Sequence, residues 1–319
     1  MKIDMRDAFF DRLVELARDN DQIIILSADH GAFALTKFEK EMPERYINVG
    51  IAEQNMVGVA AGLAASGKIV FVYGISPFVS LRVLEQLTID VAAMQLPVNV
   101  VSVGAGFTYS TDGPTHQGLQ DLSAVLTIPR MTILNSSDPE NTRFFVDAAV
   151  SSRKPHYIRI EKESLESFHR LESVDSSLQK GFSLLREGDN RLLLLSTGRI
   201  SHDILKVASM CEERLGLRPS VIDVHLIKPL PEKALLSEIK KYSHVITIEE
   251  SYLSSLGGEI SKIITKHSLP VKLSNLGIDE QLFFQGANRE EMLAAANLSP
   301  EQIYNSVKNS IEEVSYGEN

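Results

Sequence analysis

The chain lacks the features of a secreted or membrane-inserted protein. Only one of its 319 residues is cysteine, so a disulfide within the chain is excluded. Tryptophan is absent from the sequence. No charge-free apolar run reaches the roughly 18 residues that a membrane-spanning helix needs. Residues 1–7 carry charges where a signal peptide would be apolar. We therefore expect a cytoplasmic protein without a membrane partner.

The sequence also lacks an excess of positive charge. Its formal net charge is −10, with acidic residues spread along the whole chain. This charge disfavours nucleic acid or an anionic membrane surface as the main partner. The histidines show no ligand spacing, and no HExxH or GxSxG string is present. Neither a metal ion held by this chain nor a serine nucleophile is therefore indicated.

Short apolar runs alternate with helical patterns in the first half of the chain. The runs are continuous rather than alternating, which is typical of parallel strands covered on both faces. We expect strands at 23–26, 69–73, 98–103, 131–134 and 157–160, and helices at 6–18, 53–65, 80–94 and 139–150. This pattern predicts a doubly wound α/β domain.

A second region of the same kind follows. Its expected strands are 191–196, 220–224 and 244–248, and its expected helices are 203–215, 232–241 and 258–267. Between the two regions the chain loses the alternation and becomes rich in Ser, Glu, Lys and Asp. We therefore expect two doubly wound α/β domains with mostly parallel sheets, at 1–165 and 186–319, joined by a linker at 166–185.

Glu53 stands in the string GIAEQNM at 50–56, where an expected strand runs into a helix rich in glycine and alanine. A carboxylate in the first turn of a helix commonly does no more than complement the helix dipole, for under about 1 kcal/mol. Here, however, Gly58 and Gly62 allow another group to pack closely against the helix, and no cation neighbours Glu53 in the sequence. Glu53 is therefore a candidate for a poorly solvated carboxylate that binds a ligand.

A second string, DGPTHQ at 112–117, places Asp112 and His116 on a stiff Gly-Pro turn after the strand expected at 98–103. Loops at the carboxyl ends of parallel strands are where such folds bind ligands. A lone histidine is more often structural than catalytic, yet imidazole is also well suited to exchanging protons near neutral pH. The string is therefore a second candidate for site chemistry.

Together the two strings resemble the pyrimidine-binding half of the transketolase family of thiamine-diphosphate enzymes. The resemblance implies that Glu53 hydrogen-bonds the pyrimidine ring of thiamine diphosphate and so promotes loss of the thiazolium C2 proton. It also implies that Phe78 stacks on this ring and that Ile51 and Ile75 contact the cofactor. Asp29, otherwise a routine helix N-cap, matches a family aspartate near the cofactor at a subunit interface.

The resemblance also implies roles for the second string. His116 is expected to assist proton transfer at the bound carbonyl. Asp112 is expected to accept a hydrogen bond from a hydroxyl of the donor substrate, and Gln117 to contact substrate beside it.

The diphosphate-binding half of the family's site is missing. The Gly-Asp-Gly motif and the Asn that hold Mg2+ and the diphosphate are not found, because Gly188-Asp189-Asn190 reads only as a turn. The chain thus resembles the C-terminal section of a split transketolase, and Lys228-Pro229 fits the family's C-terminal domain. We expect a partner, the N-terminal-section subunit, to hold Mg2+ and the diphosphate in an α2β2 assembly.

The residues expected around the substrate also depart from the family. Gly104 and Asn135 stand where phosphosugar transketolases have His and Arg, and Ala105 stands where the related deoxyxylulose-phosphate synthases have Arg. Losing two such phosphate contacts, each worth about 1.5–3 kcal/mol, would be severe for a small phosphosugar. Neutral hydroxyls are expected nearby instead, from Tyr109, Ser110, Thr111, Ser136 and Ser137.

The sequence therefore predicts a subunit of a transketolase-like enzyme that transfers a two-carbon ketol unit between specialised sugars rather than ordinary pentose phosphates. An alternative is a deoxyxylulose-phosphate-synthase-like or 2-oxo-acid dehydrogenase β-type subunit acting on a 2-oxo acid. The string Phe284-Gln285-Gly286 is similar to the synthase tail, but a decarboxylase β subunit is not expected to carry DGPTHQ. A non-catalytic scaffold is disfavoured by Glu53 and His116.

Overall fold

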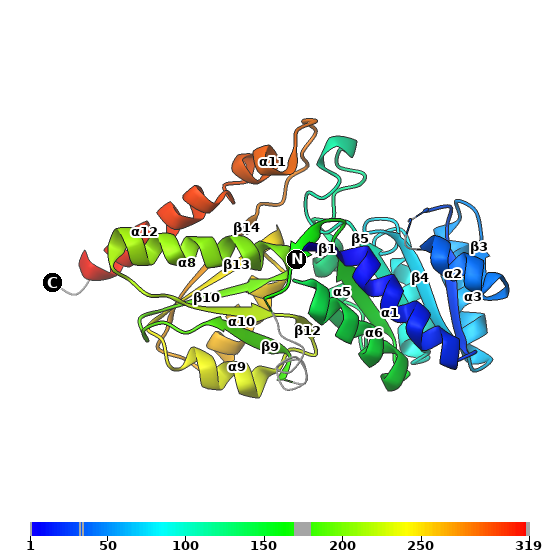
Figure 1. The fold of residues 1–319 in the computed structure, drawn as a ribbon. Helices are drawn as coiled ribbons and strands as arrows, with labels where there is room; N and C mark the ends of the chain where they lie inside the picture. Colours follow the sequence, from blue (N-terminus) through cyan, green and yellow to red (C-terminus); the bar gives the residue numbers. More distant parts are fainter. Residues whose placement is uncertain (1, 32, 34, 169–179, 317–319) are drawn as a thin grey trace.

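Two α/β domains lie side by side in the computed structural model, which describes residues 2–31, 33, 35–168 and 180–316 (Figure 1). The N-terminal domain contains a seven-stranded sheet and the C-terminal domain a five-stranded sheet. A further two-stranded sheet pairs β1 (Lys2–Asp4) with β8 (Ser164–Glu166) in antiparallel register. The prediction of two α/β domains with mostly parallel sheets is confirmed.

The seven-stranded sheet has the order β12-β6-β7-β5-β4-β2-β3, and all its strands are parallel except β12. The central strands are buried along almost their whole length, which explains the continuous apolar runs. The five strands expected in this part of the sequence are all present. The sheet comprises β2 (Ile23–Ser27), β3 (Tyr46–Asn48), β4 (Ile69–Ile75), β5 (Val98–Val103), β6 (Thr132–Asn135), β7 (His156–Ile160) and β12 (Leu226–Lys228).

Helices cover both faces of this sheet. On one face lie α1 (Met5–Asp19), α2 (Leu35–Glu41) and α6 (Pro139–Ser152), with a short 3-10 helix η1 (Pro43–Arg45) after α2. On the other face lie α3 (Glu53–Ala65), the π-helix η2 (Leu87–Ala93) and α5 (Asp121–Leu126). Among the described helices, none is long and apolar enough to cross a membrane.

The helix expected at 80–94 is shorter than the sequence suggested. Regular helix begins only with α4 (Leu84–Gln86), which continues into η2. The backbone before Leu84 forms turns instead of a regular helix. In these turns the Arg82 N–H bonds to Pro77 O at 3.2 Å, and Ser80 Oγ donates to Ser76 O at 2.6 Å. These turns place the segment from Phe78 to Arg82 at the carboxyl end of β4.

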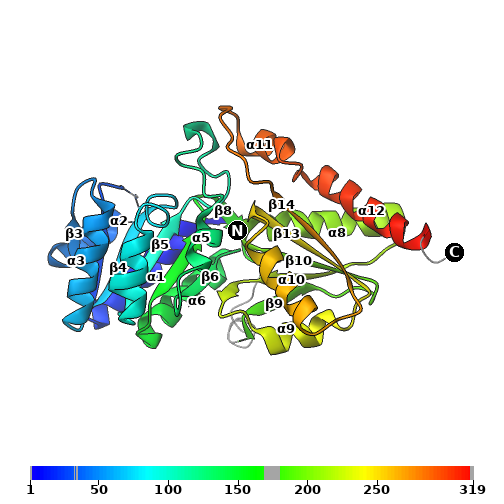
Figure 2. The ribbon, with the colours of Figure 1, turned by 180° about the vertical axis from the view of Figure 1, so that it is seen from behind.

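The five-stranded sheet has the order β14-β13-β10-β11-β9. Four strands are parallel and β9 is antiparallel to β11. In the view from behind, α9 and α10 cover one face, while the other face carries α8 and the C-terminal helices (Figure 2). The elements are β9 (Phe182–Arg186), β10 (Leu192–Thr197), η4 (Gly198–Ile200), α8 (Ser201–Leu215), β11 (Ser220–Val224), α9 (Glu232–Ile239), β13 (His244–Tyr252), α10 (Leu256–Lys266), β14 (Lys272–Ile278), α11 (Arg289–Ala295) and α12 (Pro300–Tyr316).

The linker expected at 166–185 overlaps this sheet. Residues 169–179 lie outside the described residues, and β9 already begins at Phe182. Phe182 is buried and pairs with Val224 of β11, so the second sheet starts before residue 186.

The two domains share packing and one strand. β12 follows the second domain's β11 in sequence, yet it pairs antiparallel with β6 at the edge of the first domain's sheet. One buried apolar cluster also includes Ile133 and Tyr157 of the first domain together with Phe182 and Val224 of the second. The C-terminal domain is therefore packed firmly against the sheet that carries the candidate site residues.

Candidate functional site

Glu53 is the first residue of α3, where the chain turns from β3 into the helix. Its side chain is only 3% exposed. Oε2 accepts a hydrogen bond from Arg82 Nη1 at 2.9 Å, while Oε1 is buried with no hydrogen-bond partner among the described residues. The absence of a cation near Glu53 in the sequence was therefore misleading, because the turn after β4 brings Arg82 to it from a separate segment.

Phe78 is the centre of a cluster of rings and charge beside Glu53. The guanidinium carbon of Arg82 lies 4.2 Å from the Phe78 ring centroid. The His116 ring meets the same phenyl ring edge-on, with the centroids 5.1 Å apart, and the His30 ring lies at 5.7 Å. The structure thus brings together Glu53, Phe78 and His116, which are far apart in the sequence.

His30 is a member of this cluster that sequence reasoning missed. It follows β2, and its Nδ1 is buried without a hydrogen-bond partner among the described residues. Burial lowers the pKa of His30, and although Glu53 acts in the opposite direction the net shift is downward. This environment therefore favours the neutral ring. The signal in the sequence was its position at the carboxyl end of a parallel strand, directly after Asp29.

His116 and Asp112 lie on the long loop between β5 and α5. Asp112 ends the 3-10 helix η3 (Ser110–Asp112) and is exposed. Gly113 adopts φ 77°, and the His116 N–H bonds back to Gly113 O at 3.0 Å, which closes the turn predicted from the Gly-Pro pair. The His116 Nδ1 lies 2.9 Å from Thr115 Oγ1. This leaves the other ring nitrogen as the one without a hydrogen bond in the described structure.

Gln117 differs from its neighbours on the loop. Its side chain is buried, and Nε2 donates to Phe283 O in the C-terminal domain at 3.2 Å. Oε1 is buried without a hydrogen-bond partner among the described residues. A substrate contact by Gln117 would therefore have to use Oε1.

Asp29 and Ile51 lie at the surface rather than beside the buried Glu53 carboxylate. The Asp29 carboxylate accepts from Asn48 Nδ2 at 3.3 Å, and Asn48 Oδ1 accepts from the N–H groups of Asp29 and Gly50, both at 3.0 Å. Because α2 begins only at Leu35, Asp29 is not its N-cap. Ile51 is 77% exposed and Ile75 is half-buried at the end of β4.

Two of the hydroxyls expected near the substrate are not available there. Ser136 and Ser137 are buried, and their Oγ atoms bond Asn141 at 3.0 Å and Asp223 at 2.7 Å, respectively. The expectation that they face a sugar was therefore wrong, because they tie β6 to α6 and to the C-terminal domain. Asn135 is likewise buried and donates to Thr197 Oγ1 at 2.9 Å.

Tyr109 occupies space that the glycine at 104 leaves open. A Cβ added to Gly104 would clash with Tyr109 Cε2, and Gly104 has φ +94°. The Tyr109 ring lies 6.5 Å from the His116 ring, and Lys162 Nζ lies 5.0 Å from the Tyr109 ring centroid. The loop side of the cluster therefore contains an exposed cation that the family positions at 104, 105 and 135 did not reveal.

The described residues offer a place for an aminopyrimidine. Glu53 Oε1 is a buried acceptor without a partner, and the Phe78 face beside it can stack on a planar ring. The part of the chain that the structure describes holds no group of three or more His, Cys, Asp or Glu suited to a metal ion.

Two family models match the chain. The transketolase pyrimidine binding domain matches residues 1–167, and the transketolase C-terminal domain matches residues 182–303.

The similar proteins include transketolase subunits and also 1-deoxy-D-xylulose-5-phosphate synthases, such as that of Natranaerobius thermophilus, which is 31% identical over 95% of this chain and 48% of its own length. A subunit of the apulose-4-phosphate transketolase of Phocaeicola vulgatus is 32% identical over 93% of this chain and 94% of its own length. A 6-deoxy-6-sulfo-D-fructose transketolase subunit of Clostridium sp. is 34% identical over 86% of this chain and 84% of its own.

A solved structure described as a split gene transketolase, inactive β4 tetramer, superposes with a TM-score of 0.86 at 27% identity. The match covers 96% of this chain and 98% of that one. The chain therefore belongs to the transketolase family, as a subunit built of the pyrimidine-binding and C-terminal domains.

Proposed function

We propose that this subunit provides the pyrimidine side of a thiamine-diphosphate site and acts in the transfer of a two-carbon ketol unit from a ketose to an aldehyde or carbonyl sugar. The observation that carries the proposal is the buried Glu53 carboxylate beside Phe78 and His116. Three side chains from three loops at the carboxyl edge of a parallel sheet converge there, which is where such sheets bind ligands. A structural role for Glu53 alone would not require its Oε1 to be left without a partner.

Glu53 and Phe78 would hold the aminopyrimidine. Glu53 Oε1, which is buried without a hydrogen-bond partner among the described residues, would bond a ring nitrogen, and a charge-assisted bond of this kind is strong in a buried site. Arg82 contacts both side chains in this structure, because it donates to Glu53 Oε2 and lies over the Phe78 ring. A ring stacked on that face of Phe78 would displace the guanidinium. Ile75 at the end of β4 and the exposed Ile51 and Asp29 are proposed to complete the contacts toward the cofactor.

His116 and Asp112 would act on the sugar. Thiamine diphosphate supplies a nucleophilic carbon and an electron sink for cleavage of the ketose carbon–carbon bond. His116 is half-buried against Phe78 and can give or take a proton at a carbonyl or hydroxyl oxygen through the ring nitrogen that Thr115 does not occupy. Asp112 is exposed at the end of η3 and can accept from a sugar hydroxyl. Gln117 Oε1 is a further candidate acceptor.

A partner subunit completes the site in this proposal. We propose that the transketolase N-terminal-section subunit holds Mg2+ and the diphosphate, and that two copies of each subunit form an α2β2 assembly. The solved split-gene relative, whose β4 tetramer is described as inactive, supports the need for a second kind of subunit. A cytoplasmic site of action is proposed because the sequence contains one cysteine, Cys211, so no disulfide can form within the chain.

The substrate is proposed to be a specialised sugar. The two transketolase subunits named above act, by their names, on a phosphorylated sugar and on a sulfonated one. Lys162, beside Tyr109, is a candidate for contact with such an anionic group. Neutral contacts from Tyr109 and Thr111 would bind hydroxyls.

The test is reconstitution. The chain is mixed with a separately purified N-terminal-section subunit, Mg2+ and thiamine diphosphate, and ketol transfer is followed. We expect transfer only when both polypeptides are present, with a particle mass equal to two copies of each. Transfer by this chain alone, or an active complex of one copy of each, would contradict the proposal.

A further inference from the structure

The loop that carries Asp112 and His116 has little regular structure of its own. It runs from β5 to α5 and contains only the short helix η3. Its two ends meet through Gly106 and Gly118, whose N–H groups each bond to the other's carbonyl oxygen at 2.9 Å. The position of the loop therefore depends on what holds this neck.

The C-terminal domain holds it at several points. The segment before α11 lies beside the loop in both views of the molecule (Figures 1 and 2). The contacts are hydrogen bonds from Phe107 N–H to Glu250 Oε1 at 2.8 Å, from Tyr252 N–H to Leu119 O at 3.0 Å, and from Gln117 Nε2 to Phe283 O at 3.2 Å. Arg159 of β7 also donates to Gly118 O at 2.6 Å, so this loop of the first domain is positioned both by its own sheet and by strand β13 and its surroundings in the second domain.

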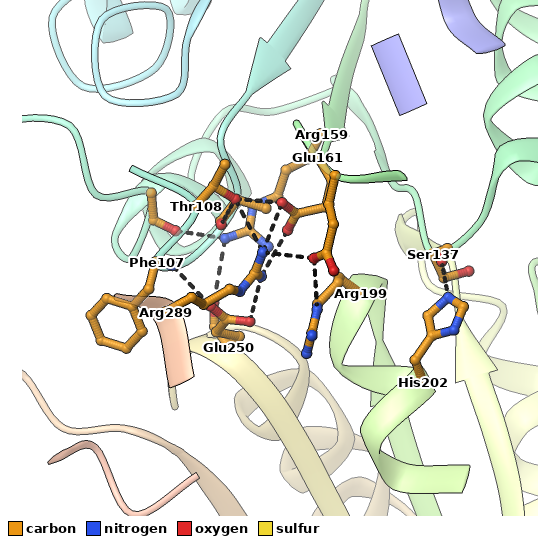
Figure 3. Close-up of polar contacts among 12 residues, drawn as sticks. Phe107, Thr108, Ser137, Arg159, Glu161, Arg199, His202, Glu250 and Arg289 are labelled. Carbon is orange, nitrogen blue, oxygen red and sulfur yellow. Dashed lines mark hydrogen bonds and ion pairs between the residues drawn. The ribbon is translucent and has the colours of Figure 1, made fainter. Parts of the chain in front are cut away.

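Arg289 lies beside one of these contacts, because it bonds the same Glu250 carboxylate that accepts from Phe107 (Figure 3). It is the first residue of α11, and its side chain is 15% exposed. Nη2 bonds Glu250 Oε2 at 2.6 Å and Glu161 Oε1 at 3.0 Å, while Nη1 bonds Glu161 Oε2 at 3.0 Å. Glu161 in turn accepts a short hydrogen bond from Thr108 Oγ1 on the loop. One guanidinium therefore bridges a carboxylate from each domain, and each carboxylate bonds the loop.

The two carboxylates need this cation. Glu161 and Glu250 are both buried. Burial alone would raise the pKa of Glu161, but the attraction and hydrogen bonds of Arg289 outweigh it and hold that pKa below its ordinary value. Arg159 also lowers the pKa of Glu161, and Arg199 interacts with Glu250. Arg289, however, is the cation that bonds both carboxylates, and its loss would leave two buried negative charges that repel each other with less compensation.

The close approach of Glu250 to the loop is built into the backbone. Gly106 has φ +57°, and a Cβ added there would clash with Glu250 Oε1. Only a glycine lets the carboxylate reach the Phe107 N–H at this place. The loop, Glu250 and Arg289 therefore form one arrangement whose parts depend on one another.

We infer that Arg289 is a positioning residue for the loop that carries Asp112 and His116, and that the C-terminal domain serves the reaction through it. The inference rests on the proposed function, because the loop is taken as the one that meets the sugar. Arg289 does not touch the Glu53 and Phe78 side of the site. Loss of the Arg289 side chain should therefore disturb the loop that carries Asp112 and His116 and leave the surroundings of Glu53 and Phe78 unchanged.

The first experiment compares full-length wild type with Arg289→Gln by hydrogen–deuterium exchange. We expect exchange in residues 104–120 to rise at least tenfold in the variant, with α3 unchanged. The matched control is Arg214→Gln, which removes an exposed ion pair to Glu301 within the C-terminal domain and should alter neither segment. Arg289→Lys keeps the positive charge but cannot bond two carboxylates in the planar geometry of a guanidinium, so it should fold even if Arg289→Gln does not. In this variant, exchange in residues 104–120 should rise by less than in Arg289→Gln, again with α3 unchanged. Equal acceleration in α3 and the loop, or none in either, would overturn the inference.

The second experiment uses the complex with the partner subunit. Arg289→Gln should lower kcat at least tenfold while the Kd for thiamine diphosphate stays within twofold of wild type. An unchanged kcat, or equal losses in kcat and cofactor binding, would overturn the positioning role. A wild-type complex without ketol transfer would instead refute the proposed function, and the exchange measurement would still test the loop contacts.

Discussion

At the scale of single residues, Glu53 combines burial with incomplete bonding. A carboxylate at a helix start is usually exposed and gains little from the helix dipole. Glu53 is 3% exposed, and one of its oxygens has no partner among the described residues. A buried acceptor without a donor costs about 1–3 kcal/mol, so its presence favours a ligand that supplies the donor.

The Glu53→Gln variant tests this directly. The amide is nearly isosteric and can keep the contact with Arg82, but it cannot hold the proton of a pyrimidine ring nitrogen. We expect proton–deuterium exchange at C2 of thiamine diphosphate in the complex with the partner to slow by at least about 100-fold, the lower range of acid–base contributions. The melting temperature should change little.

The control is Glu44→Gln, because the Glu44 side chain is 73% exposed and lies outside the cluster. It should leave the exchange rate as in wild type. If Glu53→Gln also leaves the rate unchanged, then Glu53 is only a charge at a helix terminus.

Sequence reasoning found residues that stand in distinctive strings and missed those that do not. That Glu53 and His116 lie in one cluster could be predicted, because GIAEQNM and DGPTHQ are specific strings; their roles remain predictions. Arg82 and His30 could not be predicted as members of this cluster, because each is an ordinary polar residue until the strands bring their carboxyl ends together. The roles of the hydroxyls at 136 and 137 were misjudged for the same reason, because the neighbouring sequence does not show whether these side chains point to the substrate or into the interior.

At the scale of elements, buried parallel strands were the easiest to predict. Irregular elements, such as a short antiparallel edge strand and a π-helix, were the hardest to predict. Continuous apolar runs identified β4 and β5, since strands buried on both faces need them. β12 has only three residues, and its partner β6 lies in the other domain. Its pairing is a tertiary contact without a local signal. The π-helix η2 is likewise a distortion that helical periodicity does not reveal.

Strand β7 contains a histidine that should make stability depend on pH. His156 is buried in the sheet, its Nδ1 lies 2.8 Å from Asn99 Oδ1, and burial lowers its pKa to about 4. Between that value and about 6.5, the ordinary pKa of histidine, the unfolded chain binds a proton that the folded chain does not. The stability due to neutral His156 is therefore complete above this window and falls as the pH drops through it.

We expect wild type to lose about 2 kcal/mol more unfolding free energy than His156→Gln between pH 7.5 and pH 5. Urea unfolding of both proteins at both pH values measures this. Glu249 has the opposite sign, because burial raises its pKa to about 7 and its contribution falls as pH rises, but both proteins contain it and the comparison removes it. An equal loss of unfolding free energy in the two proteins would show that the folded protein binds a proton at His156 as readily as the unfolded chain does, which would contradict a lowered pKa.

At the scale of the whole molecule, the second domain serves as part of the first domain's site. β12 extends the first sheet, and Arg289 and Glu250 reach the neck of the loop that carries Asp112 and His116. Composition and periodicity predicted two domains but not this interdependence, because buried ion pairs between distant segments leave no periodic pattern. The partner subunit was predictable for the opposite reason: a motif that the family's chemistry requires is missing.

The last prediction concerns which sugar the assembled enzyme prefers. Gly104 makes room for Tyr109, and Asn135 is committed to Thr197, so neither place contributes a cation for a sugar phosphate. Lys162 is an exposed cation beside Tyr109. One such contact discriminates less than the pair expected of a phosphosugar enzyme.

We therefore expect xylulose 5-phosphate with ribose 5-phosphate to be poor substrates compared with a specialised sugar. The experiment compares kcat/KM for these pentose phosphates with a panel of unphosphorylated, nucleotide-linked, other phosphorylated and sulfonated sugars. Lys162→Met is the matched variant. If Lys162 binds the anionic group, the variant should lower kcat/KM for charged sugars by roughly 10-fold or more and leave neutral ones unchanged, as the loss of one charge-assisted bond implies. An advantage of about a hundredfold for the pentose phosphates would mean that the partner subunit binds the phosphate, and the preference argued from this chain would be wrong.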